Sequence, residues 1–394
     1  MTGARDASAR TAALVLPPFD VINQQAETLR AQGHDVVSLG QAVPGFDPPA
    51  AAIDAARRAL VEPSTHRYSA DAGRFGLRDA LSAVFGREHG IDAQPGELII
   101  TAGGNQAFML AVMTLLDAGD EVVLVSPYFV NHEMAIRAAG ATPVEAPLTE
   151  ENGFAARWDD IVGHLTERTR AVVLCTPSNP TGAVIARAEL ARIVRELAAR
   201  RITLISDETY LHFVYDAPHA SAAANDRWRE NVVVVGTFSK SFGMTGWRAG
   251  FLLASEPVCR QAMKIQDAMI ICAPVISQIA AEAAVRADWN YARSFHDDLR
   301  IRREALEGPL RAAPGLRWSP AGGGFFLFVR VEGCRDSAAV AADILNRVHV
   351  VTIPGATFGR AGEGFLRLSY GASSVAALNA AGERLRAFFA KANS

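Results

Sequence analysis

Short apolar runs rich in β-branched residues alternate with helical patterns between about residue 50 and residue 285. Six runs carry this pattern, and they lie at 97–101, 121–126, 171–176, 202–206, 232–236 and 248–254. Continuous apolar runs of this length are typical of strands buried on both faces of a sheet, and the helical segments suit the connections between them. The pattern predicts an α/β fold in which helices flank a mostly parallel sheet.

The rhythm changes on both sides of this region. Before it, we predict a disordered stretch at 1–12, a helix at 17–33 and a short strand at 36–39. After it, we predict a long charged helix at 291–310 and three strands at 324–331, 348–353 and 365–370. Strands and helices in this order indicate an α+β arrangement. We therefore predict a large domain at 50–285 and a smaller, discontinuous α+β domain made of 1–49 and 286–394.

Composition excludes several classes of function. The chain has 394 residues, a net charge of -3 and 21% charged residues, so no nucleic-acid partner is expected. No apolar run reaches the roughly 20 residues of a membrane span, and the N-terminus lacks the apolar region of a signal peptide. The four cysteines have neither CxxC nor metal-ligand spacing, which favours reduced thiols, no metal site and a cytoplasmic protein.

Polar residues follow the predicted strands, where ligands bind in open α/β sheets. Gly103, Gly104 and Asn105 lead from the first strand into a helix, whose backbone N–H groups suit a phosphate. The segment is neither GxGxxG nor a Walker loop, so a dinucleotide or ATP is disfavoured. Phe129 follows the second strand, and a core aromatic is an equally good interpretation of it.

The next strand ends carry an amide, a carboxylate and a phenol. Asn179 lies in a proline-rich turn, where local hydrogen bonding is the usual role of asparagine. Asp207 and Tyr210 follow the strand at 202–206, although Asp207 alone is more simply interpreted as a helix N-cap. These side chains become informative together, because parallel strands bring their carboxyl ends to one edge of the sheet.

Lys240 follows the strand at 232–236, and burial there would lower its pKa and free the amine to form an imine. A loop lysine beside a strand is the alternative. Hydroxyls and a guanidinium close to it in the sequence could bind a phosphate, and they belong to Thr237, Ser239 and Arg248. Six strand ends thus deliver phosphate donors, an aromatic ring, an amide, a carboxylate with a phenol, and an amine.

This set of residues resembles the fold-type I aminotransferases that use pyridoxal 5'-phosphate (PLP), in the class I/II branch with aspartate and kynurenine aminotransferases. The resemblance runs from Pro17 to the C-terminus, and its most specific segments are 179–182, 207–210, 239–240, 244–250 and 365–370. It implies a seven-stranded sheet and ping-pong transfer of the α-amino group of an L-amino acid to a 2-oxo acid.

The resemblance also implies roles for individual residues around the cofactor. Lys240 would form the internal aldimine, a Schiff base, and later move the proton at Cα. Asp207 would keep the pyridine nitrogen protonated, and Asn179 and Tyr210 would hydrogen-bond the ring oxygen. Phe129 would stack on the ring. The phosphate ligands would be Thr237, Ser239, Arg248, Gly103, Gly104 and Asn105.

Substrate and subunit contacts are implied in the same way. Arg367 would bind the substrate α-carboxylate in a bidentate pair, with Asn179 and Ala42 beside it. Tyr68 matches a tyrosine that reaches the phosphate of the neighbouring subunit, which implies a homodimer with shared active sites.

The chain departs from the family at several positions. Ala42 replaces a glycine, and Asn105 stands where aspartate enzymes often carry lysine or a hydroxyl residue. His132 replaces a common tyrosine, where hydrogen-bonded packing is the simpler role and proton transfer the alternative. The segment 269–274 is apolar, which argues weakly against a dicarboxylic substrate. Asp20 or Asp71 could select a basic amino acid, although solvated surface acids are the simpler interpretation of both.

Two other functions stay open at this point. The same lysine, aspartate and arginine could support PLP-dependent elimination, replacement or oxidation of an amino acid. A ligand-sensing domain of a transcription regulator would need a DNA-binding module, and about 16 residues before Pro17 are too few for a domain of even 50 residues.

Overall fold

A computed structural model describes residues 8–216 and 218–392 of the chain. Its largest sheet has seven strands in the order β2-β8-β7-β6-β5-β3-β4. The strands are β2 (Leu98–Thr101), β3 (Glu121–Ser126), β4 (Thr142–Pro147), β5 (Thr169–Cys175), β6 (Thr203–Asp207), β7 (Val232–Thr237) and β8 (Gly250–Leu253). β8 runs in the direction opposite to the other six strands of this sheet, so the predicted mostly parallel sheet is confirmed.

The six strands expected from the apolar runs all form, with ends shifted by up to two residues. The seventh, β4, was not predicted, because its sequence contains Pro143 and Pro147 and has no apolar run. It pairs only with β3, at the edge of the sheet. Proline is tolerated at an edge because one side of the strand needs no ladder hydrogen bonds.

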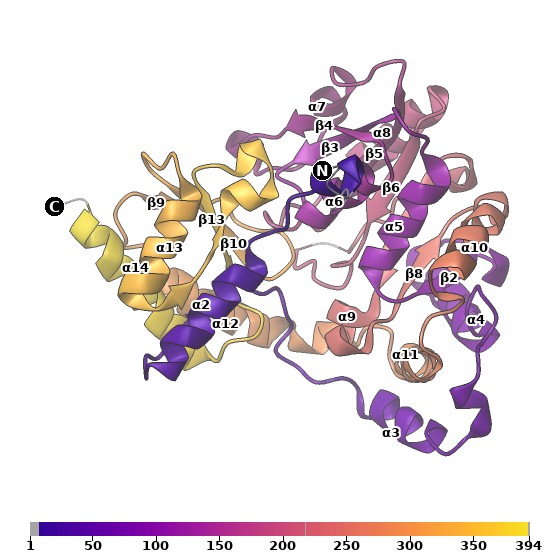
Figure 1. Cartoon of the computed structure of the whole chain (residues 1–394), viewed down its shortest axis with the longest axis horizontal. Helices are drawn as coiled ribbons and strands as arrows, with labels where there is room; N and C mark the ends of the chain where they lie inside the picture. The colour runs from indigo at the N-terminus through magenta and orange to yellow at the C-terminus, as the bar shows by residue number, and fades with distance from the viewer. Residues whose placement is uncertain (1–7, 217, 393–394) are drawn as a thin grey trace, which may run out of the picture.

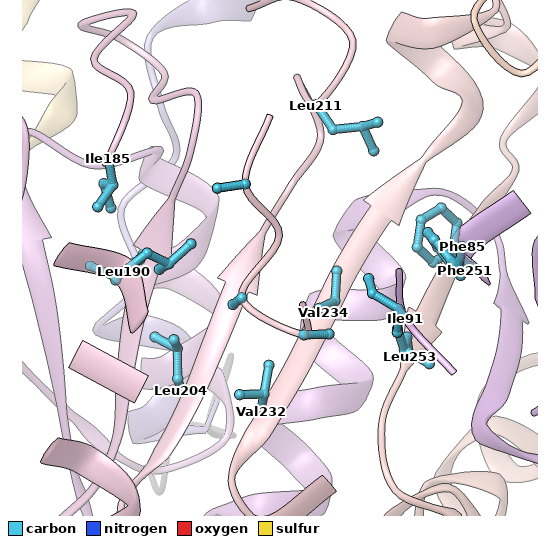
Figure 2. Packing of buried hydrophobic residues seen from close by; sticks show 14 of the residues in the cluster. Phe85, Ile91, Ile185, Leu190, Leu204, Leu211, Val232, Val234, Phe251 and Leu253 are labelled. Carbon is cyan, nitrogen blue, oxygen red and sulfur yellow. The ribbon is translucent and has the colours of Figure 1, made fainter. Parts of the chain in front are cut away.

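Helices cover both faces of this sheet, as the continuous apolar strands predicted. In β7, Val232 and Val234 face one core, whereas Val233 and Val235 face the other. Figure 2 shows the first core, where Val232 and Val234 lie near Leu204 and Leu253. The helices on this side are α3 (Ala50–Ala59), α4 (Phe75–Val84), α8 (Arg187–Ala199) and α11 (Val275–Ala287), and those opposite are α5 (Gly104–Leu115), α6 (Val130–Ala138) and α10 (Glu256–Ile270).

The C-terminal part has its own core around a four-stranded antiparallel sheet (Figure 1). The sheet order is β12-β13-β10-β9, with β9 (Leu316–Arg317), β10 (Phe326–Val331), β12 (Ile353–Pro354) and β13 (Phe365–Ser369). Its helices are α12 (His296–Leu310), α13 (Ser337–Val348) and α14 (Val375–Ala392). The helix predicted at 291–310 is a 3₁₀ turn (Tyr291–Phe295) that continues into α12, and the strand predicted at 348–353 is split into β11 (Val350–Val351) and β12.

The N-terminal segment packs against this C-terminal part. Strand β1 (Val37–Ser38) pairs in parallel with β11, and Gln25 of α2 (Phe19–Ala31) donates a hydrogen bond of 2.7 Å to Asn346 of α13. The short helix α1 (Ala9–Ala12) corrects the expectation of disorder for residues 9–12, and residues 1–7 lie outside the described chain. A domain division at residues 49 and 285 stays a prediction. Among the described helices, none is both long enough and apolar enough to cross a membrane.

Candidate active site

A cavity of about 400 Å³ lies at the carboxyl ends of the parallel strands, a size typical of small-molecule sites. It is lined by the last residues of β5, β6 and β7, by the start of α5, and by segments from the N-terminal and C-terminal parts. Twelve of the predicted site residues line it: Ala42, Gly104, Asn105, Phe129, Asn179, Asp207, Tyr210, Thr237, Ser239, Lys240, Arg248 and Arg367.

Asp207 is buried at the end of β6, and a turn rather than a helix follows it, so the helix N-cap interpretation is wrong. Its Oδ1 accepts a hydrogen bond of 2.9 Å from the backbone N–H of Thr209, and its Oδ2 accepts one of 2.9 Å from Nε2 of His132. Burial opposes ionisation, but the hydrogen bonds from His132 and Thr209 lower the pKa of Asp207 below its ordinary value. The carboxylate is therefore charged at neutral pH.

His132 is buried in the first turns of α6. Its ring stacks on Phe108 at a centroid distance of 4.2 Å and meets the edge of Phe129 at 5.5 Å. These contacts and the bond to Asp207 fix the imidazole on three sides, which matches the hydrogen-bonded packing role expected from the sequence. The sequence did not indicate that its partner would be Asp207, because the two residues lie on different elements.

Lys240 lies in α9 (Phe238–Ser241), a single turn that directly follows β7. Its Nζ donates a hydrogen bond of 2.7 Å to the backbone oxygen of Ala42. Burial, and then the positive charges of Arg367 and Arg248, lower the pKa of Lys240 to about 8. A sizeable fraction of the amine is therefore neutral near physiological pH, as a nucleophilic amine requires.

Hydroxyl and guanidinium groups line the same cavity as Lys240. Thr237 Oγ1 lies 2.9 Å from Ser239 Oγ, and both side chains line the cavity. Arg248 has a left-handed backbone, with φ of 52°, and its Nη1 donates to the oxygen of Thr245. Gly103 lies behind the cavity wall at φ +88°, and a Cβ there would come within 2.5 Å of Nη2 of Arg248. The missing side chain leaves room for the guanidinium beside the N-terminus of α5.

Arg367 of β13 is 2% exposed and faces the cavity from the C-terminal part. Its Nη1 donates a hydrogen bond of 3.0 Å to Oδ1 of Asn179, and its Nη2 donates one to the backbone oxygen of Gly40. Its Nε has no hydrogen-bond partner. Burial lowers the pKa of Arg367 to about 10, which leaves it charged at neutral pH. A buried guanidinium with a free N–H is suited to a carboxylate ligand.

Tyr210 completes the group of polar side chains around Asn179. It is buried, and its ring packs edge-on against Phe325 and Phe326 from the C-terminal part. Burial raises the pKa of Tyr210, so the phenol keeps its proton and can donate a hydrogen bond.

Two predicted residues do not line the cavity of their own chain. Gly104 lines the cavity, but the preceding Gly103 does not. Tyr68 lies outside the cavity, and 77% of its surface is exposed. Asp20 and Asp71, considered for a basic side chain, are also absent from the lining. Sequence reasoning missed several lining residues, namely Pro17, Phe19, Gln41, Val43, Phe108, Asn131, Cys175 and Thr209. Proximity in sequence to Ala42, Phe129 and Asp207 could have indicated Gln41, Val43, Asn131 and Thr209.

Comparisons with known proteins agree with this geometry. Residues 34–385 match the family described as aminotransferase class I and II. The chain belongs to this family. An aspartate aminotransferase of Pyrococcus horikoshii is 36% identical over 344 residues, which cover 86% of this chain and 87% of the relative. An aromatic-amino-acid aminotransferase of Thermococcus litoralis is also 36% identical, over 86% of this chain and 88% of the relative.

The solved structures lead to the same family. Aspartate aminotransferase from Thermus thermophilus with maleate superimposes with a TM-score of 0.90 at 33% identity, over 98% of this chain and 100% of the other. The chain is therefore a PLP-dependent aminotransferase. Similarity to aminotransferases favours amino transfer over elimination, replacement or oxidation of the amino acid.

The residues of the cavity fit PLP. The N-terminus of α5, two hydroxyls and Arg248 converge where a phosphate can bind, and the space that Gly103 leaves is filled by that guanidinium. Asp207 would supply a carboxylate for a protonated ring nitrogen, and Lys240 would supply an amine of lowered pKa. The aminotransferase thus has a matching group for each end of the cofactor.

Proposed function

We propose that the enzyme transfers the α-amino group of an L-amino acid to a 2-oxo acid in two ping-pong half-reactions, with Lys240 as the group that moves the proton at Cα. When bound, PLP supplies a carbonyl that takes up the amino group and a ring that accepts the electron pair released at Cα. The observation that carries the proposal is that the Lys240 amine, the buried carboxylate of Asp207 and the buried guanidinium of Arg367 line one cavity.

The polar residues on the ring side would hold the cofactor in one orientation. Asp207, kept ionised and fixed by His132, is suited to pair with the ring nitrogen and hold its proton. Asn179 and Tyr210 can donate hydrogen bonds to the ring oxygen. Phe129 lines the cavity too, and its ring centroid lies 5.5 Å from that of His132. These contacts would keep the reacting carbon facing Lys240.

The phosphate side would anchor the cofactor. Thr237, Ser239 and Arg248 line it together with Gly104 and Asn105, the first residues of α5. A helix N-terminus with free N–H groups and a nearby guanidinium favours a dianionic ligand.

Arg367 is proposed to bind the substrate α-carboxylate. Its Nε is unpartnered, and Nη2 is held by a backbone oxygen that a carboxylate could replace. The neighbouring Asn179 and Ala42 would then flank the bound amino acid. Arg367 would thereby fix the carboxylate of the substrate and help to turn the Cα–H bond toward Lys240 for proton transfer.

A half-reaction measurement tests the proposed function. The enzyme loaded with PLP and mixed with an amino acid, without an oxo acid, should convert the cofactor to pyridoxamine 5'-phosphate and release one equivalent of the corresponding 2-oxo acid. Adding the 2-oxo acid of a second amino acid that reacts in the first step should reverse the conversion, because the amino group leaves again in the second half-reaction. Release of ammonia without pyridoxamine 5'-phosphate, over a broad panel of amino acids, would show that the reaction is not a transamination.

We also infer a homodimer in which Tyr68 contributes to the neighbouring subunit's site. Tyr68 is exposed here, and large apolar side chains in the same region are exposed as well, namely Leu60, Val61 and Phe75. Exposed apolar side chains close to Tyr68 in the sequence favour an interface between subunits.

Sedimentation equilibrium tests the dimer against the chain mass of 42.0 kDa, and a species of twice this mass is expected. Tyr68→Phe should weaken cofactor binding although Tyr68 lies outside its own cavity. A fully active monomer would contradict the inference. The four thiols, all free in the structure, support a cytoplasmic location, which cell fractionation would test.

A further inference from the structure

The exposed Tyr68 is followed by a short segment that packs against the large sheet of its own subunit. We call this segment, residues 69–74, the arm segment. It lies along the edge strand β2, where the backbone N–H of Ile100 donates a hydrogen bond of 3.0 Å to the oxygen of Ala72. Gly73 permits this close approach, because its φ is +90° and a Cβ there would lie 2.6 Å from the Cβ of Ile100. The arm segment is therefore held directly against β2.

A buried glutamine holds both ends of the arm segment. Gln278 of α11 is fully buried, and its Oε1 accepts a hydrogen bond of 2.7 Å from the backbone N–H of Arg74. Its Nε2 donates one of 3.1 Å to Oγ of Ser69 and one of 2.7 Å to the backbone oxygen of Ala273. The amide oxygen and both amide hydrogens are thus used, which fixes the side chain in one orientation. Gln278 therefore determines where the chain continues into Tyr68.

A second buried glutamine links the arm segment to the proposed phosphate site of the same subunit. Gln266 of α10 is also fully buried, and its Nε2 donates hydrogen bonds of 3.0 Å and 3.3 Å to the backbone oxygens of Ile100 and Asp71. Its Oε1 accepts one of 3.0 Å from Nε2 of Gln106. Gln106 lies in the first turn of α5, and its own Oε1 accepts from the backbone N–H of Ala102, between β2 and α5. These bonds join the arm segment to the turn that leads into α5.

The three glutamines differ in what they hold. Gln106 bonds to the turn before α5, Gln278 bonds to the arm segment, and Gln266 bonds to both Gln106 and the arm segment. In the homodimer inferred above, that turn serves the cofactor of its own subunit, whereas Tyr68 serves the cofactor of the neighbouring subunit. The described lining of the cavity contains none of the three glutamines, so each would act by positioning other groups.

We propose that Gln278 and Gln266 are positioning residues for the cofactor of the neighbouring subunit, because they hold the arm segment and with it Tyr68. Through its bond to Gln106, Gln266 also supports the turn at the cofactor of its own subunit, where Gln106 is the positioning residue. The proposal rests on the proposed function, since it takes Tyr68 as a ligand in the neighbouring subunit's site. It extends that function by assigning cofactor binding across the dimer to side chains outside the cavity.

Hybrid dimers, purified through a different affinity tag on each subunit, separate the two directions. One subunit carries Lys240→Ala, so borohydride fixes PLP on the Lys240 peptide of the other subunit alone. The PLP concentration that gives half-maximal labelling then measures binding at this one site. Tyr68→Phe in the Lys240→Ala subunit should raise that concentration about 10-fold, the scale of losing one hydrogen bond to a charged group. The same change in the labelled subunit should leave it within about twofold.

Gln278→Met removes the amide with little change of side-chain shape. In the Lys240→Ala subunit it should raise the half-maximal PLP concentration at least about fivefold, because Tyr68 is then less well placed, and in the labelled subunit it should have an effect within about twofold. Gln106→Met should show the opposite dependence on placement, and Gln266→Met should act from either subunit. The matched control is Gln261→Met, at an exposed position of α10, which should act from neither.

The placement of the substitution distinguishes positioning from general destabilisation. Gln278→Met that acts equally from both subunits, or from neither, would overturn the proposal. If this variant does not assemble, Gln278→Glu replaces it with the same expectation, since the carboxyl group keeps an acceptor for Arg74 and loses at least one donor. If Tyr68→Phe has no effect from the Lys240→Ala subunit, the shared site is wrong and the proposal falls with it. Absence of label in the native dimer would instead contradict the proposed function.

Discussion

Replacing Lys240 with alanine should lower amino transfer by about 10³-fold or more, which is the scale of losing a nucleophile that also serves as proton carrier. The amine is held 2.7 Å from the oxygen of Ala42 in a buried position, and no other lysine lines the described cavity. The measurement is the rate of the half-reaction with a good donor. Added methylamine should restore part of the rate, because a free amine can enter the space left by the side chain.

The chain offers a clean control for this variant. It contains three lysines, Lys240, Lys264 and Lys391, so a covalent label can be assigned without ambiguity. Borohydride treatment of the native enzyme with PLP should fix the cofactor on the peptide that carries Lys240, and Lys240→Ala should lose this label. Lys264→Ala, at an exposed position of α10, should keep both label and activity. A label that remains in Lys240→Ala would disprove the assignment of the covalent site.

Asp207→Asn should lower the half-reaction rate by about 10²- to 10³-fold, the range seen when one preorganised electrostatic group is removed. The amide has nearly the shape of the carboxylate and can still accept a hydrogen bond. It carries no charge, so the described lining no longer holds a proton on the ring nitrogen. The carboxylate is ionised in the native enzyme because His132 and Thr209 lower its pKa. Cofactor content, measured alongside, separates chemistry from binding.

The control for this change is Asp267→Asn on the exposed side of α10, which should leave the rate within about twofold, as for surface substitutions. If the Asp207→Asn variant binds PLP fully and reacts at the native rate, Asp207 has no role in the reaction. The largest effect is expected in kcat rather than in KM, because the carboxylate acts on the cofactor and not on the substrate.

The large sheet could be predicted from sequence because each of its inner strands is apolar on both faces. Val232 to Val235 alternate between two cores, and such a run has few other ways to be buried. The edge strand β4 escaped prediction for the opposite reason, since Pro143 and Pro147 weaken the strand signal and only one neighbour supplies hydrogen bonds. The paired strand β1 was found, but its partner β11 could be identified only from the structure.

The candidate site, too, could be predicted only in part from the sequence. Residues at strand ends, such as Asp207 and Lys240, could be predicted because the sheet collects strand ends at one edge. The bond between His132 and Asp207 could not, because it joins residues 75 positions apart on different elements. Pro17 and Phe19 were also missed, since they reach the cavity only through the packing of the N-terminal segment on the C-terminal part.

The antiparallel direction of β8 has a consequence for how the cofactor is held. Lys240 follows β7 and Arg248 precedes β8, and the two strands are paired so that Thr237 lies opposite Gly250. The segment between them therefore connects two antiparallel strands whose adjoining ends are paired. Lys240, the proposed covalent anchor, and Arg248, the proposed phosphate ligand, are thus held near each other by the pairing of β7 with β8. The rest of the cavity is built from distant parts of the chain, whereas these two proposed cofactor ligands come from one short segment.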